Sequence, residues 1–345
     1  MNNKKEVLEV PLISRDRNYW LVRTEGGRYY KSFFTNGYIA ISWNELGAEI
    51  FNNTTEKNPL SKDLVFDFYK NMYKNDEEKI KYYSRNSSRI ATTLNRFKFG
   101  IKAGDIVIIP STDSDEVSFG EVLSDDLYFE RDFPTVNPKD RADKKFCPFI
   151  KRREVKWLKT VKRAELEPKL YSLFYSHHTI SLADKEKYGH YIDRTIDSIY
   201  IKGETAHLVL EVKNENDINA LVFANLIKDS VMAVDSLSRK NEISGRKIKI
   251  RANVQSPGPM EFFGPITEIL ILTVIIKKIF GSDVIEFKFG KKKDSNVDRV
   301  LKELEKKDFE KYKEMIRTGR ANTNIIRESL DELVVGDPSV NINSN

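Results

Sequence analysis

The sequence predicts an α+β domain followed by an α/β domain, and three observations lead to that fold class. The chain has 345 residues, enough to build two separate hydrophobic cores. Hydrophobic residues make up 40% of it and charged residues 32%, which is typical of folded rather than disordered proteins. Strands and helical patterns are mixed in the first half, whereas they alternate in the second.

Residues 1–163 are predicted to form the first domain, and residues 164–184 a connector. The strands of the first domain are bounded by turns such as Gly26-Gly27. The predicted strands cover residues 19–22, 38–43, 106–109, 119–123 and 153–161. Apolar side chains recur at helical spacing over residues 64–72 and 77–97. Residues 124–150, rich in Asp, Lys and Pro, are predicted to form a long loop.

Residues 185–293 are predicted to form the second domain, with a mixed sheet and two main helices. The predicted strands cover residues 197–201, 207–212, 247–254 and 284–289, and the helices 218–237 and 265–280. Polar helices are expected over residues 294–334, followed by a flexible tail at 335–345. Alternating strands and helices of this length indicate a compact α/β domain.

The charge and cysteine content narrow the possible partners and sites. A net charge of +6 and a pI near 9.0 favour a polyanion such as DNA or RNA, but only weakly, because 52 acidic residues accompany 58 basic ones. Cys147 is the only cysteine, which excludes an internal disulfide and a cysteine zinc site. The four histidines also argue against a histidine-rich metal site.

The sequence predicts a cytoplasmic protein without a membrane partner. The first residues, MNNKKEVLEVPL, lack the apolar core of a signal peptide. The most apolar run, 266–280, contains Glu268, Lys277 and Lys278 and is shorter than the roughly 20 residues that a bilayer requires. We therefore expect this run to be a buried helix.

Five phrases of the first domain occur in a meaningful order. They are Arg17-Asn-Tyr-Trp-Leu-Val-Arg23, Gly37-Tyr-Ile-Ala-Ile-Ser-Trp43, Ile101-Lys-Ala-Gly-Asp-Ile-Val107, Phe119-Gly-Glu-Val122 and Glu154-Val-Lys-Trp157. This order resembles the EVE domains of the PUA-like superfamily. It is closest to the N-terminal domains found ahead of Mrr-type restriction nucleases and in other prokaryotic defence proteins. The resemblance covers residues 17–163, and long insertions at 47–75 and 124–150 depart from it.

The resemblance implies a strongly bent sheet or pseudo-barrel with a pocket for a nucleobase flipped out of its helix. Such a pocket needs an aromatic ring for stacking and cations outside it for phosphates. The stacking candidates are Trp20, Tyr38 and Trp43; the phosphate-binding candidates are Arg23, Lys98, Lys102, Arg152 and Arg153. The competing interpretation is that the aromatic rings fill the core and the arginines are a solvated charge run.

A nuclease centre is a second hypothesis. If Lys202 pairs with Ala206 in a hairpin, Asp197 lies opposite Glu211, and both could bind Mg²⁺ or Mn²⁺ with Lys213 on the same face. This layout is similar to the PD-(D/E)xK nuclease core. The competing interpretation is an exposed Glu–Lys strand end, since Glu-x-Lys recurs elsewhere in this chain and a slip of one residue would separate the carboxylates.

The sequence thus predicts a protein that binds DNA or RNA and reads a base, including a modified base, in a prokaryotic restriction or antiviral defence system. The first alternative is a metal-dependent endonuclease acting at Asp197, Glu211 and Lys213. The second is an oligomerising scaffold that presents the helix at 265–280 to a second copy or to a partner protein of the defence system.

Overall fold

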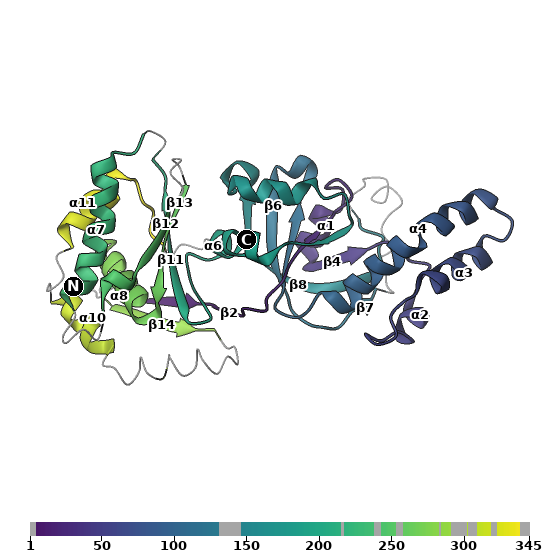
Figure 1. Cartoon of the computed structure of the whole chain (residues 1–345), viewed down its shortest axis with the longest axis horizontal. Helices are drawn as coiled ribbons and strands as arrows, with labels where there is room; N and C mark the ends of the chain where they lie inside the picture. Colours follow the sequence, from purple (N-terminus) through teal and green to yellow (C-terminus); the bar gives the residue numbers. More distant parts are fainter. Residues whose placement is uncertain are drawn as a thin grey trace. The chain divides into compact units, whose positions relative to one another are not determined.

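The computed structural model describes residues 5–130, 146–214, 217–237, 243–252, 258–282, 284–290, 302, 309–318 and 323–338. The chain divides into two compact units (Figure 1). The inserted unit is Arg17–Ile192, and the terminal unit combines Met1–Asp16 with Asp193–Asn345. The boundaries therefore differ from the expected division at 163 and 185, because the first residues pair with strands of the terminal unit and the expected connector pairs with the inserted unit.

The inserted unit is built on a seven-stranded sheet that curls into a half-barrel. Its strands run in the order β4-β8-β6-β5-β3-β9, with β7 also paired to β8. They are β3 (Tyr19–Val22), β4 (Tyr38–Ile41), β5 (Ile106–Pro110), β6 (Glu116–Val122), β7 (Tyr128–Phe129), β8 (Lys151–Lys162) and β9 (Ile180–Leu182). β3, β4 and β5 are buried along their whole length, which explains their unbroken apolar sequences. The bent sheet expected for this half is confirmed.

The helices of the inserted unit are α1 (Tyr30–Asn36), α2 (Ala48–Asn52), α3 (Lys62–Met72) and α4 (Glu77–Asn95). Helix α6 (Lys185–Ile196) begins in this unit and ends in the terminal unit. The two helices expected at 64–72 and 77–97 are confirmed as α3 and α4, which form a hairpin that extends from the sheet (Figure 1). Side chains cap both N-termini: Ser61 Oγ accepts from the Leu64 N–H, and Asp76 Oδ1 from the Lys79 N–H. One π-helical turn, Arg96–Gly100, continues α4 to the sheet.

Parallel aromatic rings hold the α3–α4 hairpin together. The rings of Tyr69 and Tyr83 lie 3.7 Å apart with an interplanar angle of 5°, and Tyr73 stacks at their side. Tyr69 is fully buried, and its hydroxyl donates to Glu45 Oε2 at 3.3 Å. Since stacked aromatic pairs add to the energy of burial, this tyrosine stack stabilises the packing of α3 against α4.

The terminal unit contains a five-stranded sheet in the order β12-β13-β11-β10-β2 and a parallel pair, β1-β14. The strands are β1 (Lys5–Val10), β2 (Leu12–Ile13), β10 (Ile199–Lys202), β11 (Thr205–Val212), β12 (Lys249–Ala252), β13 (Gly258–Pro265) and β14 (Val284–Phe289). The helices are α7 (Ala220–Ser236), α8 (Ile266–Ile279), α10 (Phe309–Arg317) and α11 (Asn324–Glu332). The mixed sheet with two main helices and a helical extension is confirmed.

Helix α8 is the central element of the terminal unit. Twelve of its residues are buried, and it packs on β11, β13 and α7. The buried Lys277 ammonium forms ion pairs with Glu6 at 2.6 Å and Asp337 at 2.5 Å. The hypothesis that this helix is presented to a partner is therefore wrong, because its side chains are used within the unit. None of the helices in the described ranges combines the length and apolar character of a membrane span.

Three features of the terminal unit were not expected from the sequence. β1 and β2 begin the chain as strands, and β13 precedes α8 where no strand was expected. The tail does not start at residue 335: Val335 is buried and forms a β-bridge with Val212, and the Gly336 N–H donates to the Glu211 carbonyl. Residues 253–257 and 339–345 lie outside the described ranges.

The side chain of Arg153 joins α4 to the sheet. It is fully buried, and its guanidinium donates to four main-chain carbonyls, those of Phe97, Lys98, Ser124 and Asp125. Burial lowers the pKa of Arg153 to about 10, with nearby carboxylates opposing the shift. One guanidinium thus satisfies carbonyls of the π-helical turn and of the loop after β6, which would otherwise be buried without donors.

We expect Arg153→Ala to destabilise the inserted unit by more than about 3 kcal/mol, because several buried carbonyls lose their donor at once. Denaturant unfolding followed by tryptophan fluorescence measures this unit alone, since all three tryptophans (Trp20, Trp43 and Trp157) lie in it. The exposed Arg28→Ala serves as the control and should cost less than about 0.5 kcal/mol. Equal effects of the two changes would contradict the anchoring role of Arg153.

Candidate nucleic-acid interface

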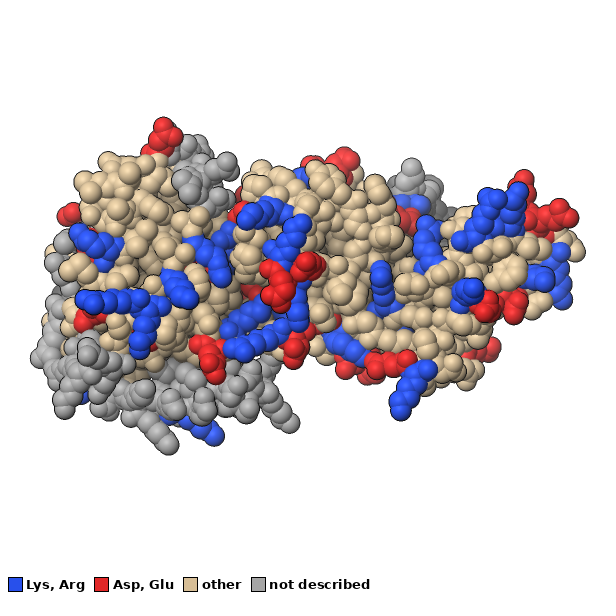
Figure 2. Space-filling model, in the orientation of Figure 1, with Lys and Arg blue, Asp and Glu red and all other residues tan. Residues whose placement is uncertain are grey.

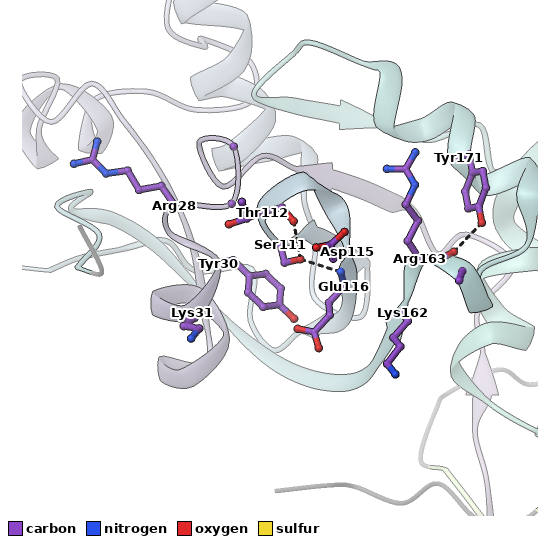
Figure 3. A pocket seen from close by; sticks show the side chains of 13 residues that line it. Arg28, Tyr30, Lys31, Ser111, Thr112, Asp115, Glu116, Lys162, Arg163 and Tyr171 are labelled. Atoms are coloured by element: carbon purple, nitrogen blue, oxygen red, sulfur yellow. Dashed lines mark hydrogen bonds between the residues drawn. The ribbon is translucent and has the colours of Figure 1, made fainter. Parts of the chain in front are cut away.

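An open groove of about 1170 Å³ lies on the inserted unit (Figure 3). Four of its lining side chains are basic and two acidic, so the groove carries a net positive charge. The basic residues are Arg28, Lys31, Lys162 and Arg163, and the acidic ones Asp115 and Glu116. The walls come from the turn before α1, the loop between β5 and β6, and the end of β8 (Figure 3).

The backbone at one wall of the groove is shaped by Gly27. Its φ is +88°, and a Cβ there would lie 2.1 Å from the Thr112 amide nitrogen. Only glycine permits both the left-handed conformation and this close approach. The turn at 25–27 is therefore pressed against the β5–β6 loop, where the Ser111 hydroxyl accepts from the Glu116 N–H at 2.9 Å. A fixed main-chain rim results, with cationic side chains standing around it (Figure 3).

Two tyrosines line the groove and are held in place by hydrogen bonds. The Tyr30 hydroxyl lies 2.7 Å from Ser118 Oγ, which lies 2.7 Å from Thr160 Oγ1. Burial raises the pKa of Tyr30, with the hydrogen bonds to Ser118 and Thr160 opposing the shift. The Tyr171 hydroxyl donates to the Arg163 carbonyl, and the Arg163 guanidinium lies 5.1 Å from the ring of Tyr171. These contacts fix the rings in place.

A row of aromatic rings continues from the groove through α1 to β8. Tyr30 stacks on Phe34 at 6.0 Å, and Phe34 on Trp157 at 5.9 Å. The Trp157 ring covers Gly120, where any Cβ would lie 2.6 Å from it, and its indole N–H donates to the Phe33 carbonyl. Phe34 remains 38% exposed. A partly exposed aromatic ring beside cations is the combination that stacks on nucleobases in single-stranded nucleic acids.

The stacking candidates chosen from the sequence lie elsewhere. Trp20 is buried, and its indole N–H donates to Asp105 Oδ2 at 2.9 Å. Tyr38 is buried under the Arg152 guanidinium, with its hydroxyl 2.7 Å from Ser32 Oγ. Trp43 is partly buried at a positive φ of 63°. For Trp20 and Tyr38 the prediction is wrong, because both rings belong to the core.

Four of the five phosphate-binding candidates hold the fold together instead. Arg152 is buried and pairs with Glu130 at 3.0 Å, and Arg153 is fully buried as described above. Arg23 Nε donates to the Ser176 carbonyl, and Lys98 Nζ to the Thr54 carbonyl. Lys102, although exposed, pairs with Glu56. The sequence missed the groove residues because no motif marks them; the basic–aromatic alternation of Arg28-Tyr-Tyr-Lys31 is the available signal.

Lys151 is a buried basic residue of β8, at the position that pairs with Ile41 of β4. Its ammonium is fully buried and donates to the Trp43 carbonyl at 2.6 Å and the Leu46 carbonyl at 3.2 Å. Burial lowers the pKa of Lys151 to about 7, and Glu45 opposes the shift. These bonds hold the segment after β4 in the left-handed conformation of Trp43.

The hypothetical nuclease centre is contradicted by the hairpin register. Lys202 pairs with Thr205 rather than with Ala206, so Asp197 is level with Leu210 and one residue out of line with Glu211. Asp197 follows the end of α6 and lies outside β10. Glu211 and Lys213 are exposed. Among the described residues no cluster of three or more His, Cys, Asp or Glu side chains could hold a metal ion.

The other face of the terminal unit's sheet carries a buried polar network. Glu261 is fully buried, and its carboxylate lies 2.6 Å from His207 Nδ1. The carboxylate also accepts hydrogen bonds from the Tyr200 hydroxyl at 3.1 Å and from the Arg251 guanidinium at 3.4 Å. Burial raises the pKa of Glu261, but His207 and the arginines Arg251 and Arg194 outweigh burial, so that the pKa lies below its usual value. This network satisfies a buried carboxylate and ties four elements together.

Residues 19–180 match a family model described as a domain of unknown function, DUF8426. This span falls within the inserted unit and includes every residue that lines the groove. No curated protein and no solved structure matches the chain.

We expect Trp20→Phe to lower the stability of the inserted unit by about 1–3 kcal/mol, because the buried Asp105 carboxylate loses one of its donors. If the groove binds nucleic acid, this change should leave the binding unchanged, since the ring faces the core. Denaturant unfolding and a binding titration of the same sample measure the two effects. If the variant kept the native stability but no longer bound nucleic acid, the result would contradict the core assignment and indicate that Trp20 contacts the ligand.

The stability of the inserted unit should rise with pH between about 7 and 9, because unfolding restores the ordinary pKa of Lys151 and so takes up a proton. Over this range the change is on the order of 3 kcal/mol. Above about pH 9 the pKa of Cys147, which burial raises, opposes this rise. Unfolding curves at several pH values, again followed by tryptophan fluorescence, measure the slope. Lys151→Met should remove this slope whatever its effect on absolute stability, and an unchanged slope would contradict the assignment.

Proposed function

We propose that the inserted unit binds nucleic acid through the groove and the aromatic row beside it. The observation that carries the proposal is the groove itself: four cations surround a fixed main-chain rim, and exposed Phe34 continues the row from Tyr30. Cations bind phosphates without regard to sequence, and stacked rings bind unpaired bases. Both kinds of interaction are available within one surface of one compact unit.

The resemblance of residues 17–163 to EVE domains supports the same proposal and extends it. It favours recognition of a base, including a modified base, in a prokaryotic restriction or antiviral defence protein. Because Trp20 and Tyr38 are in the core, we propose that an unpaired base would stack on Phe34 or Trp157 instead. The nuclease hypothesis is not retained, since Asp197 and Glu211 are out of register.

The test is a binding titration of the full chain with single-stranded and duplex DNA and RNA, at salt concentrations between about 50 and 200 mM. We expect salt-dependent binding that weakens when Arg28, Lys31 and Lys162 are changed to Gln. The slope of log K against log salt should fall by about one for each phosphate that the variant no longer neutralises. Phe34→Ala should cost about 1–3 kcal/mol with single strands.

The matched control removes the same charge from the terminal unit, with Lys228, Arg246 and Lys249 changed to Gln. These three side chains are exposed, so their removal should leave the salt dependence close to that of the unchanged protein. Absence of binding to every probe at low salt would overturn the proposal. An equal weakening in the control would show that net charge, and not the groove, is responsible.

A further inference from the structure

One face of α4, continued by the π-helical turn that follows it, carries a row of cations outside the groove. Lys81, Arg85, Arg89 and Arg96 follow one another at spacings of 4, 4 and 7 residues, which places them on the same side of a helix with 3.6 residues per turn. All four are exposed. We call these residues the α4 row. Between Lys81 and Arg96 the row spans about 22 Å.

Acidic residues accompany this row only at its start, where Glu77 and Glu78 precede Lys81. The sequence contains neither Asp nor Glu between Glu78 and Asp105. Within the described ranges the four cations make no ion pair, whereas the flanking Lys79 and Lys102 pair with Asp76 and Glu56. Like charges one turn apart destabilise a helix, so this arrangement is unfavourable for the protein alone. A solvated helix face normally mixes both signs, as α3 does with Asp63, Asp67 and Lys70.

The helix that carries the row is rigidly supported. Its opposite side buries Ile90, Ala91 and Leu94, and the tyrosine stack joins it to α3. Arg153 anchors the π-helical turn that continues α4 to the sheet. Figure 1 shows the hairpin extending from the sheet of the same unit, and Figure 2 shows several Lys and Arg side chains over it, interspersed with Asp and Glu. The backbone therefore holds Lys81, Arg85 and Arg89 about 6 Å apart along the helix axis, and Arg96 about 10 Å beyond Arg89.

We propose that α4 lies along the phosphate backbone of a nucleic-acid duplex, as a binding surface separate from the groove. A straight, rigid row of unpaired cations matches a straight, stiff polyanion, and a flexible single strand would gain less from that rigidity. The row offers no array of base-reading groups, so its binding is independent of sequence. This inference rests on the proposed function, because it adds a second surface for the same nucleic-acid ligand.

The test changes Lys81, Arg85 and Arg89 to Gln in the full chain and titrates a DNA duplex of about two helical turns, the matching RNA duplex and the corresponding single strand. We expect the duplex affinity to fall and the slope of log K against log salt to become shallower by about three, one for each residue. A change of base sequence should not alter this effect. Single-strand binding through the groove should be largely kept.

The control removes an equal charge from the same hairpin, with Lys57, Lys62 and Lys74 changed to Gln; these are exposed residues on or beside α3. Unchanged thermal midpoints would show that both variants fold. The inference fails if the row variant retains the duplex affinity and salt slope, if the control is weakened as much, or if the weakening is confined to single strands. If the unchanged protein binds no nucleic acid, the proposed function fails with it; if only the groove variants lose binding, the inference alone fails.

Discussion

The inserted unit depends on the need to satisfy buried main-chain carbonyls. Where α4 meets the sheet, the π-helical turn and the loop after β6 leave carbonyls without main-chain donors, and the guanidinium of Arg153 supplies them. Lys151 and Lys98 do the same for the segments after β4 and α2. Long cationic side chains are suited to this task, because one side chain offers several donors and no acceptor.

The same constraint explains which parts of the site could be predicted from the sequence. The helices α3 and α4 and the apolar strands were predictable, since their periodicity records burial directly. The roles of Arg152 and Arg153 were not, because sequence reasoning assigns cations to the surface, whereas these two are surrounded by carbonyls and a carboxylate. The cations of the α4 row follow helical spacing and were visible in the sequence. Their arrangement on one exposed face was recognisable only after the structure showed that the opposite side of α4 is buried.

In the hairpin of β10 and β11, a change of one residue in the register decides whether Asp197 and Glu211 could form a metal site. A two-residue turn at Gly203 and Glu204, with Gly203 at a positive φ of 59°, closes it one residue tighter than we expected. This register places Ile199 and Ile201 on the same face as Leu208 and Leu210, in the core beneath α8. The burial of that face therefore fixes the register, and Asp197 cannot align with Glu211 as a result.

The order of the two units along the chain determines when each strand of the terminal unit can find its partner during synthesis. β1 and β2 emerge before the inserted unit, but β2 needs β10 and β1 needs β14, whose residues begin at 199 and 284. At about 5–20 residues per second, β1 waits roughly 15–55 s for its partner, while all of residues 17–192 can already fold. Glu6 and Glu9 flank the apolar Val7 and Leu8 of this segment. Such charges discourage pairing with the strands of other nascent chains, so the first strand carries its own protection against aggregation.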